Sequence, residues 1–355
     1  MPSPIRPAIA RMPGYVPGAQ PQGKTVKLNT NENPYPPSPE VIRALRAALD
    51  GGGECARRYP DPLCRELRQA IAEFDGVSPD QIVVGNGSDE ILRLLMTVTL
   101  DPGSEVGTLW PTYSYFEFLA AQCDARPVRH GVDTGGRWPD SLFEGGERLL
   151  LICNPNPPVG TLQPHEMISR LCEARPESLV VIDEAYIGFA PRGASAVSLL
   201  GSHANLMVVR TLSKSHQLAG LRAGYAIGTG EALAALLKIK DSYNVNALTQ
   251  AAATAAIGDT GHFESTRAKV IAERECLAAE MRRRGFEVPE SHGNFLFAIH
   301  VRAQEIFEAL AERRVFVRWW DKPGMRDGFR ITVGLPEQSD ALLRALDEVT
   351  AQLGR

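Results

Sequence analysis

Short apolar runs rich in β-branched residues alternate with longer helical patterns between residues 38 and 228. The predicted strands lie at 81–87, 105–111, 148–154, 178–186, 205–213 and 222–228, and the predicted helices at 38–49, 62–74, 88–100, 113–123 and 164–174. Strands without a polar face need cover on both sides, and strand–helix alternation is typical of parallel sheets. The sequence therefore predicts an α/β fold with a mostly parallel sheet between helices.

The pattern changes in the last hundred residues. A long helix over 262–285 is followed by strand-like segments, a helix over 303–314, strands over 315–320 and 329–334, and a final helix over 339–354. This mixture is typical of an α+β layer. We predict three parts, namely an N-terminal arm over 1–35 that is rich in Pro, Gly and Asn, a large domain over 36–250 and a small C-terminal domain over 251–355.

Composition excludes several classes of function. The net charge is −4 over 355 residues, which gives no basic surface for nucleic acid. No apolar run is long enough to span a bilayer, so no membrane association is expected. The six cysteines form no C-x-x-C pair, and the N-terminus lacks the apolar stretch of a signal peptide, so a cytoplasmic location is expected. The seven histidines form no H-E-x-x-H pattern, and no metal site is predicted.

One phosphate-binding motif is rejected on its context. Residues 18–25, GAQPQGKT, match the pattern G-x-x-x-x-G-K-[ST]. That motif needs a strand before the loop and a helix after it, so that backbone N–H groups converge on phosphate. Prolines surround the match, and Asn and Pro residues over 29–37 oppose a helix there.

Three features at the ends of predicted strands carry chemistry. In GNGSDE (85–90) a glycine turn leads into a helix start, which offers free N–H groups to a phosphate, although Ser88 could equally be only an N-cap. Asp183 ends the apolar run VVID and needs a cationic or donor partner, for which a structural salt bridge is the alternative. Lys214 follows another apolar strand; a buried lysine becomes nucleophilic, whereas most lysines at strand ends are simply exposed.

Arg222 lies eight residues after Lys214 and can return to the same site to hold a phosphate with its guanidinium group. Strand ends are where open α/β sheets bind ligands, so these features are expected to meet. An amine, a carboxylate, a phosphate cradle and an arginine are the groups that a pyridinium aldehyde bearing a phosphate requires.

The order of motifs resembles the fold-type-I pyridoxal-phosphate aminotransferases, and more narrowly the histidinol-phosphate aminotransferase family. The resemblance rests on GYVPGAQ, KLNTNENPYPPSP, RYPDP, GNGSDE, WPTYSYF, NPNPPVG, DEAY, SKSHQLAGLRAGY, SYNVN and FRITVG, which together cover nearly the whole chain. It implies pyridoxal 5'-phosphate as cofactor, a large domain with a mostly parallel seven-stranded sheet, a smaller α+β domain, and a homodimer with shared active sites.

The resemblance also implies roles for individual residues. Lys214 is expected to bind the cofactor covalently and to move the substrate's Cα proton, Asp183 to pair with the pyridine N–H, and Tyr186 to hydrogen-bond the ring's 3-oxygen. Tyr113 is expected to stack on the ring, although it could equally be a core aromatic. The other expected cofactor contacts are Ser88, Asp89, Asn156, Ser213, Arg222 and, from the neighbouring subunit, Tyr59.

For the substrate, Arg330 resembles the family's arginine for the anionic end, which can be a carboxylate or a phosphate. Arg318 and Tyr15 are expected to assist with the phosphate of histidinol phosphate, although Arg318 could instead be a solvated strand residue. The small-molecule partners would be glutamate and imidazole-acetol phosphate, with 2-oxoglutarate and histidinol phosphate as products. An aromatic amino-acid aminotransferase is the nearest alternative, and a threonine-phosphate decarboxylase is a further one.

Three positions depart from the family pattern. Pro157 stands where an asparagine usually contacts the cofactor's 3-oxygen, and proline offers no side-chain donor. Either Asn156 substitutes from one residue earlier or Tyr186 acts alone. His216 and Gln217 stand where phenylalanine and glycine are usual.

Overall fold

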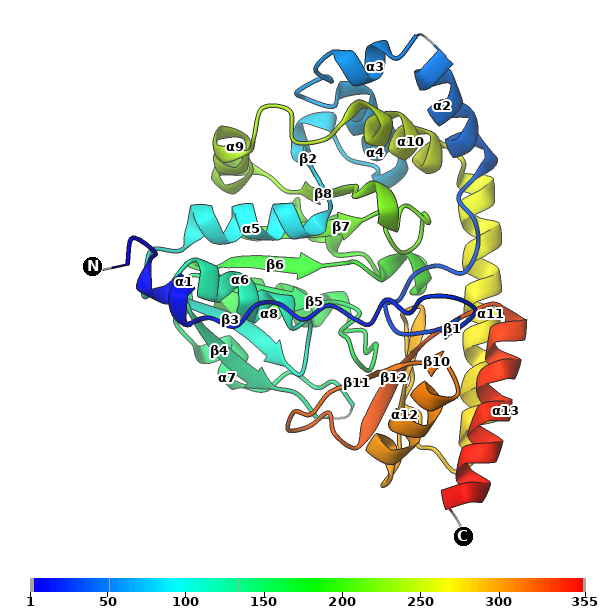
Figure 1. The fold of residues 1–355 in the computed structure, drawn as a ribbon. Coiled ribbons are helices and arrows are strands. Elements are labelled where there is room, and N and C mark those ends of the chain that lie inside the picture. The colour runs from blue at the N-terminus through cyan, green and yellow to red at the C-terminus, as the bar shows by residue number, and fades with distance from the viewer. Residues whose placement is uncertain (1–2, 51, 134, 354–355) are drawn as a thin grey trace.

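The computed structural model describes residues 3–50, 52–133 and 135–353 (Figure 1). Its largest sheet has seven strands in the order β2-β8-β7-β6-β5-β3-β4. These are β2 (Ile82–Gly85), β3 (Glu105–Trp110), β4 (Arg126–Gly131), β5 (Leu149–Cys153), β6 (Leu179–Asp183), β7 (Leu206–Thr211) and β8 (Gly224–Ile227). Strand β8 runs opposite to the other strands of this sheet, which all share one direction. The predicted α/β class with a mostly parallel sheet is confirmed.

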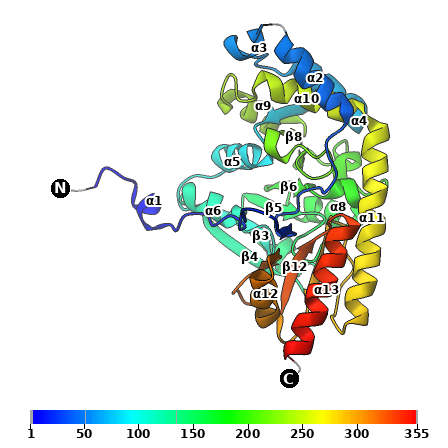
Figure 2. The same cartoon turned by 45° about the vertical axis from the view of Figure 1, so that its right-hand side comes forward.

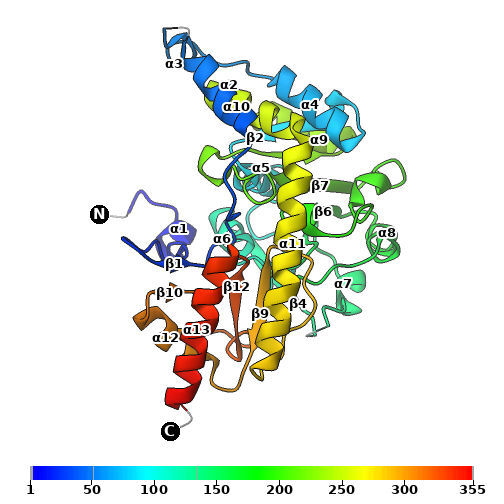
Figure 3. The ribbon, with the colours of Figure 1, turned by 90° about the vertical axis from the view of Figure 1, so that its right-hand side faces the viewer.

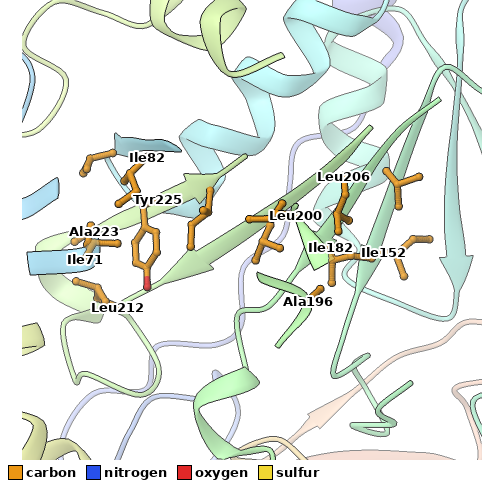
Figure 4. Close-up of a cluster of buried hydrophobic side chains, with 14 of the residues drawn as sticks. Ile71, Ile82, Ile152, Ile182, Ala196, Leu200, Leu206, Leu212, Ala223 and Tyr225 are labelled. Carbon is orange, nitrogen blue, oxygen red and sulfur yellow. The ribbon is translucent and has the colours of Figure 1, made fainter. Parts of the chain in front are cut away.

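Helices cover both faces of this sheet, as its apolar strands require. One face is covered by α2 (Pro39–Asp50), α4 (Arg65–Asp75), α8 (His165–Ala174) and α10 (Ala247–Gly258), and the other by α5 (Ser88–Thr99), α6 (Tyr115–Gln122) and α9 (Gly230–Ile239). Successive strand residues point to opposite faces, so Val180 and Ile182 join the first core while Val181 joins the second. Figure 4 shows the first core, with side chains from the sheet and from α4 in contact.

A second unit is built from the C-terminal part of the chain. Its antiparallel sheet has the order β11-β12-β9, from β9 (Phe295–Ile299), β11 (Arg318–Trp319) and β12 (Gly328–Thr332). The helices α11 (Thr260–Arg283), α12 (Ala303–Glu312) and α13 (Pro336–Leu353) pack around it. Figure 3 shows α11 running from the large sheet's side down to this unit, beside α13.

The N-terminal segment is not separate from these units. Its strand β1 (Val26–Lys27) pairs in parallel with β10 (Val315–Phe316), and Leu28 is buried in the core of the C-terminal unit. Before β1, the segment with α1 (Pro7–Arg11) extends past α6 (Figure 2). The division at residues 35 and 250 stays a prediction, and the second boundary lies within α10.

Some helices and strands of the large unit were not predicted. Strand β4, RPVRHG, is mostly exposed and pairs only with β3, so it carries no apolar pattern. Helix α9 and the alanine-rich α10 lie in the stretch between the last predicted strand and the long helix. The remaining short helices are α3 (Glu54–Arg57) and α7 (Ser141–Glu144). No helix among the described residues combines the length and the apolar composition that a bilayer crossing needs.

A buried ion network ties the first helical layer to the sheet below the site. Arg210 of β7 forms ion pairs with Asp75 at the end of α4 and with Glu184 after β6, and it also donates to Ser195. Burial opposes its charge, but Glu184 and Asp75, together with the nearby Tyr225, raise the pKa of Arg210 above its usual value. One guanidinium therefore compensates two buried carboxylates.

Replacing Arg210 with methionine should destabilise the protein by about 3–5 kcal/mol, because two carboxylates would stay buried without their cation. Urea unfolding of the cofactor-free protein measures this free energy. Arg148→Met is the control, since Arg148 and its partner Asp101 are both largely exposed and should change it by less than about 1 kcal/mol. Equal effects of the two substitutions would contradict the structural role of Arg210.

Candidate active site

Two adjoining cavities lie where the ends of the large sheet meet the C-terminal unit. The inner one has a volume of about 200 Å³ and the outer one about 350 Å³, and both are lined by Thr30, Tyr113, Tyr186, Lys214 and Arg222. Among the residues predicted from the sequence, the inner cavity adds Ser88, Asp89, Asp183 and Ser213. The outer cavity adds Tyr15, Arg318 and Arg330. The structure therefore brings together most of the predicted site.

Lys214 follows β7 and extends into both cavities. Its Nζ donates to the backbone oxygen of Thr30 at 3.0 Å. Burial, and next the nearby Arg330 guanidinium, lowers the pKa of Lys214 to about 8. More of this amine is therefore neutral near pH 7 than of an ordinary lysine, and the neutral form is the one that attacks an aldehyde.

Asp183 is the last residue of β6 and is buried. The backbone N–H of Ala185 donates to its carboxylate at 3.0 Å, and no cationic side chain pairs with it among the described residues. Burial raises the pKa of Asp183 to about 7, and the charges of Asp89 and Glu184 add to the rise. This carboxylate thus suits a ligand that brings a positive N–H group, such as a protonated pyridine.

The start of α5 forms a compact anion cradle with Arg222. Gly87 precedes the helix with φ 82°, and a Cβ there would lie 2.6 Å from Arg222 Nη2. Arg222 donates from Nη2 to Asp89 at 3.2 Å and from Nη1 to Ser213 Oγ at 3.5 Å. The first N–H groups of a helix have no intrahelical acceptor, so the cradle provides backbone, hydroxyl and guanidinium donors for a phosphate.

The two tyrosines differ in their hydrogen bonds. Tyr113 donates from its hydroxyl to Asp89 at 3.2 Å. The hydroxyl of Tyr186 accepts from Asn31 Nδ2 at 3.0 Å, and its ring packs edge-on against Phe295. Both rings line the space between Lys214 and the cradle.

Two arginines face the outer cavity from neighbouring strands. Arg318 of β11 and Arg330 of β12 are cross-strand partners, and each guanidinium lies over the ring of Trp320, at 5.4 and 5.3 Å. Neither has a carboxylate partner among the described residues, and Arg330 Nε is buried without an acceptor. The pKa of Arg330 is lowered, and burial is the largest cause of this shift. Such a shift is expected for a buried cation without a counter-ion. The pair forms a binding place for an anion.

Two predicted residues lie outside both cavities. Asn156 donates from Nδ2 to the backbone of Pro111 and accepts from Thr112 Oγ1, so its amide is occupied. It lines a different cavity, bordered by Trp110 and Phe297. Tyr59 is 80% exposed and stacks on Tyr243 with ring centroids 4.2 Å apart.

Sequence reasoning missed the contribution of residues 29–33 as a wall of the site. In Figure 1 the dark blue N-terminal segment, to which these residues belong, crosses between the large sheet and the C-terminal unit. Asn29 accepts from Arg330 through its backbone oxygen, Thr30 from Lys214, and Asn33 donates to the backbone of Lys214. The signal was the string NTNEN, whose short polar side chains bind backbone groups in non-regular segments.

His216 and Gln217 have structural roles beside Lys214. The His216 ring stacks on Phe263 at 4.8 Å, and burial lowers its pKa to about 4, so it is a neutral aromatic group. Gln217 adopts φ 58°, a conformation that glycine accepts most readily, and its amide binds Ser215 O and Thr266 Oγ1.

The fold and the donor set define a pyridoxal-phosphate-dependent enzyme of fold type I. The site fits that cofactor because a low-pKa amine, an uncompensated buried carboxylate and an anion cradle surround one cavity. Each of these groups matches one part of the cofactor, namely the aldehyde, the pyridine nitrogen and the phosphate.

Comparisons with known proteins agree with this class. The family described as "Aminotransferase class I and II" matches residues 23–346. The histidinol-phosphate aminotransferase of Geotalea uraniireducens is 39% identical over 350 residues, covering 98% of this chain and 99% of the relative. Histidinol-phosphate aminotransferase 1 of Bradyrhizobium diazoefficiens is 41% identical over 352 residues, covering 97% and 98%.

A solved structure is similar over the whole chain. The histidinol-phosphate aminotransferase of Sinorhizobium meliloti, in complex with pyridoxal-5'-phosphate, has a TM-score of 0.90 at 27% identity and covers 99% of both chains. The chain therefore belongs to the aminotransferase class I and II family. The predicted family resemblance, enzyme class and cofactor are confirmed by this membership.

Asp183→Asn should stabilise the cofactor-free protein at pH 8 by about 2–4 kcal/mol. The native pKa of Asp183 is raised to about 7 from an ordinary 3.8, so its contribution to stability is full below pH 3.8 and is lost as pH rises through 7. The difference between variant and parent should therefore grow across that window and vanish at lower pH. Urea unfolding at several pH values measures it, with the exposed Asp101→Asn as control.

The same variant should bind pyridoxal phosphate more weakly, because the neutral amide cannot compensate a protonated ring nitrogen. A stability difference that does not change with pH would contradict the buried, uncompensated state of Asp183.

Proposed function

We propose that this enzyme exchanges an amino group between glutamate and imidazole-acetol phosphate, giving 2-oxoglutarate and histidinol phosphate in histidine biosynthesis. The observation that carries the proposal is the cross-strand pair Arg318 and Arg330, which faces the outer cavity without a carboxylate partner among the described residues. The names of relatives near 40% identity support the same substrate.

One anion site can serve both half-reactions. A guanidinium group binds a carboxylate or a phosphate through parallel N–H donors. Arg330 donates from Nη2 to Asn29 O, and its buried Nε stays available for a ligand. Arg318 contacts Val16 O at a long 3.4 Å and lies beside Tyr15 at the mouth of the cavity. Glutamate's distal carboxylate and the phosphate of histidinol phosphate would thus bind in turn.

Bound pyridoxal phosphate supplies an aldehyde that receives the amino group and a ring that accepts electrons when Cα loses its proton. Lys214 would hold the cofactor through its Nζ and, as a neutral amine, would take the proton from the substrate's Cα. Asp183 would keep the ring nitrogen protonated, Tyr186 would donate to the ring's 3-oxygen, and Tyr113 would contact the ring. The cradle of Ser88, the backbone at Asp89, Ser213 and Arg222 would hold the phosphate.

We further propose a homodimer in which each subunit completes the other's site. Tyr59 is largely exposed and lies outside the cavities of its own chain, while the side chain of Arg222 is 43% exposed at the phosphate cradle. An exposed aromatic pair, Tyr59 with Tyr243, suits burial against a partner. The six free cysteines support the proposed cytoplasmic location, where thiols stay reduced.

An aromatic amino-acid aminotransferase is the second candidate, because Tyr15, Tyr113 and Trp320 line the outer cavity and would also accept an aromatic side chain. The two candidates differ in whether the phosphate of the substrate contributes to its affinity.

A half-reaction screen tests the substrate. Loss of the yellow absorption of the lysine-bound cofactor should be fastest with histidinol phosphate and slower with phenylalanine and tyrosine. The Lys214→Ala variant should not show this absorption and should not turn over. Arg318→Met should reduce the rate constant over KM for histidinol phosphate at least about tenfold, the value of one charged hydrogen bond, with a smaller effect on phenylalanine. Indifference to histidinol phosphate with fast phenylalanine turnover would overturn the substrate, and release of carbon dioxide from threonine phosphate would indicate the decarboxylase.

Mixing two inactive variants tests the shared site. Tyr59→Ala and Lys214→Ala homodimers should each be poorly active. After unfolding and refolding together, the mixture should recover about a quarter of the parental activity, since half of the dimers are hybrids with one intact site. Tyr243→Ala mixed in the same way with Lys214→Ala distinguishes direct participation of Tyr59 from support of the interface. Failure of the Tyr59→Ala mixture to gain activity would contradict sharing.

A further inference from the structure

The Tyr186 hydroxyl could act in either direction. A phenol hydroxyl can donate or accept, and its proton rotates to suit its neighbours. Tyr186 borders both cavities next to Lys214, so the direction of its hydrogen bond decides what it offers a ligand there. A partner that can only donate would settle that direction.

Such a partner exists at the start of a three-step chain. The backbone N–H of Asn31, which can only donate, points to Thr332 Oγ1 at 2.9 Å. Thr332 Oγ1 in turn donates its proton to Asn31 Oδ1 at 3.1 Å. The amide of Asn31 therefore presents Nδ2 to the Tyr186 hydroxyl, at 3.0 Å. Because the Tyr186 oxygen accepts this bond, its own proton is left for the cavity.

The opposite orientation of the Asn31 amide is unfavourable. Thr332 Oγ1 would then face two donors, and its own proton would have no acceptor among the described residues. Asn31 is 1% exposed and Thr332 4%, so bulk solvent does not reach that hydroxyl. A buried hydroxyl proton without an acceptor is costly, so the network has one favoured direction.

The backbone around the chain is fixed as well. Asn294 Nδ2 donates to Asn31 O at 3.0 Å, and Thr332 N donates to Leu28 O at 2.9 Å. Asn31 adopts φ 55°, a region that asparagine tolerates better than most residues. The direction of the Tyr186 hydroxyl is thus set by β12 and the N-terminal segment, which belong to different parts of the sequence.

The side chains at positions 156 and 157 cannot supply this hydrogen bond. The Asn156 amide is bound to Pro111 and Thr112, and Pro157 has no side-chain donor. Tyr186 is therefore the directed hydroxyl donor beside Lys214.

We propose that Asn31 and Thr332 are positioning residues that make Tyr186 a hydrogen-bond donor to the 3-oxygen of pyridoxal phosphate. The inference rests on the proposed placement of Tyr186 at that oxygen. Donation stabilises negative charge on the oxygen, and so weakens proton binding by the chromophore that Lys214 forms with the cofactor.

A pH titration of that chromophore's absorption tests the proposal in four variants. Tyr186→Phe removes the donor. Thr332→Val and Asn31→Ala remove the hydrogen bonds that direct the Tyr186 hydroxyl, and Thr332→Ser keeps the hydroxyl at position 332. The first three should move the titration midpoint upward, Thr332→Val by about half a pH unit. Thr332→Ser should titrate like the parent. The titratable groups around Tyr186 are the same in every protein compared, namely Tyr113, Cys153, Asp183, Lys214 and Arg330.

A double variant separates direction from packing. In the Tyr186→Phe background, Thr332→Val should add no further shift, because no hydroxyl remains to be directed. An additive shift would overturn the proposal. So would a midpoint unchanged in Thr332→Val and Asn31→Ala while urea unfolding of the cofactor-free protein shows lower stability. An unchanged midpoint in Tyr186→Phe would reject the placement of Tyr186 and this inference with it, whereas a chromophore that still reacts with histidinol phosphate would leave the proposed transamination intact.

Discussion

The chemistry of this site depends on an amine and a guanidinium that are buried close together. Lys214 follows a strand of the large sheet, and Arg330 belongs to the C-terminal sheet. Burial and the Arg330 charge lower the pKa of Lys214, while burial and the neighbouring Arg318 lower the pKa of Arg330. One arrangement thereby has two consequences. The amine becomes a nucleophile near neutral pH, and the guanidinium remains available for an anionic substrate.

These buried charges are tolerated because other buried charges near them are paired. Asp183 lies next to Glu184 in sequence, and Glu184 would raise the pKa of Asp183 further if its charge were free. Arg210 pairs with Glu184 and so leaves Asp183 as the uncompensated carboxylate at the cavity. The two apolar cores on either side of the sheet supply the stability that such a site costs.

Local pattern was enough to predict the large sheet, since buried strands are continuously apolar and the glycine turn before Ser88 marks a helix start. The local pattern did not predict a strand that is mostly exposed or a helix that is packed between other helices. Strand β4 is exposed, so no apolar run marks it, and α10 owes its position to packing between α2 and α4 rather than to amphipathic spacing. The chemistry of Lys214, Asp183 and Arg222 followed from their places at strand ends. The contacts of residues 29–33 did not, because they join segments that lie 155 to 301 positions apart, as the bonds of Asn31 to Tyr186 and to Thr332 show.

The departures from the family pattern show that each position is constrained by a physical property rather than by one residue type. At 216 the requirement is a flat, uncharged ring against Phe263, which a neutral histidine meets. At 217 it is a positive φ, whose strain in glutamine is offset by two hydrogen bonds of its amide. At 157 proline lacks the side-chain donor of the family's asparagine. In our proposal the Tyr186 hydroxyl supplies a donor to the same oxygen, and Asn31 fixes the direction of that hydroxyl. Substitution beside Lys214 is therefore compatible with the chemistry as long as the charge, the backbone angle and the hydrogen-bond direction at each position are kept.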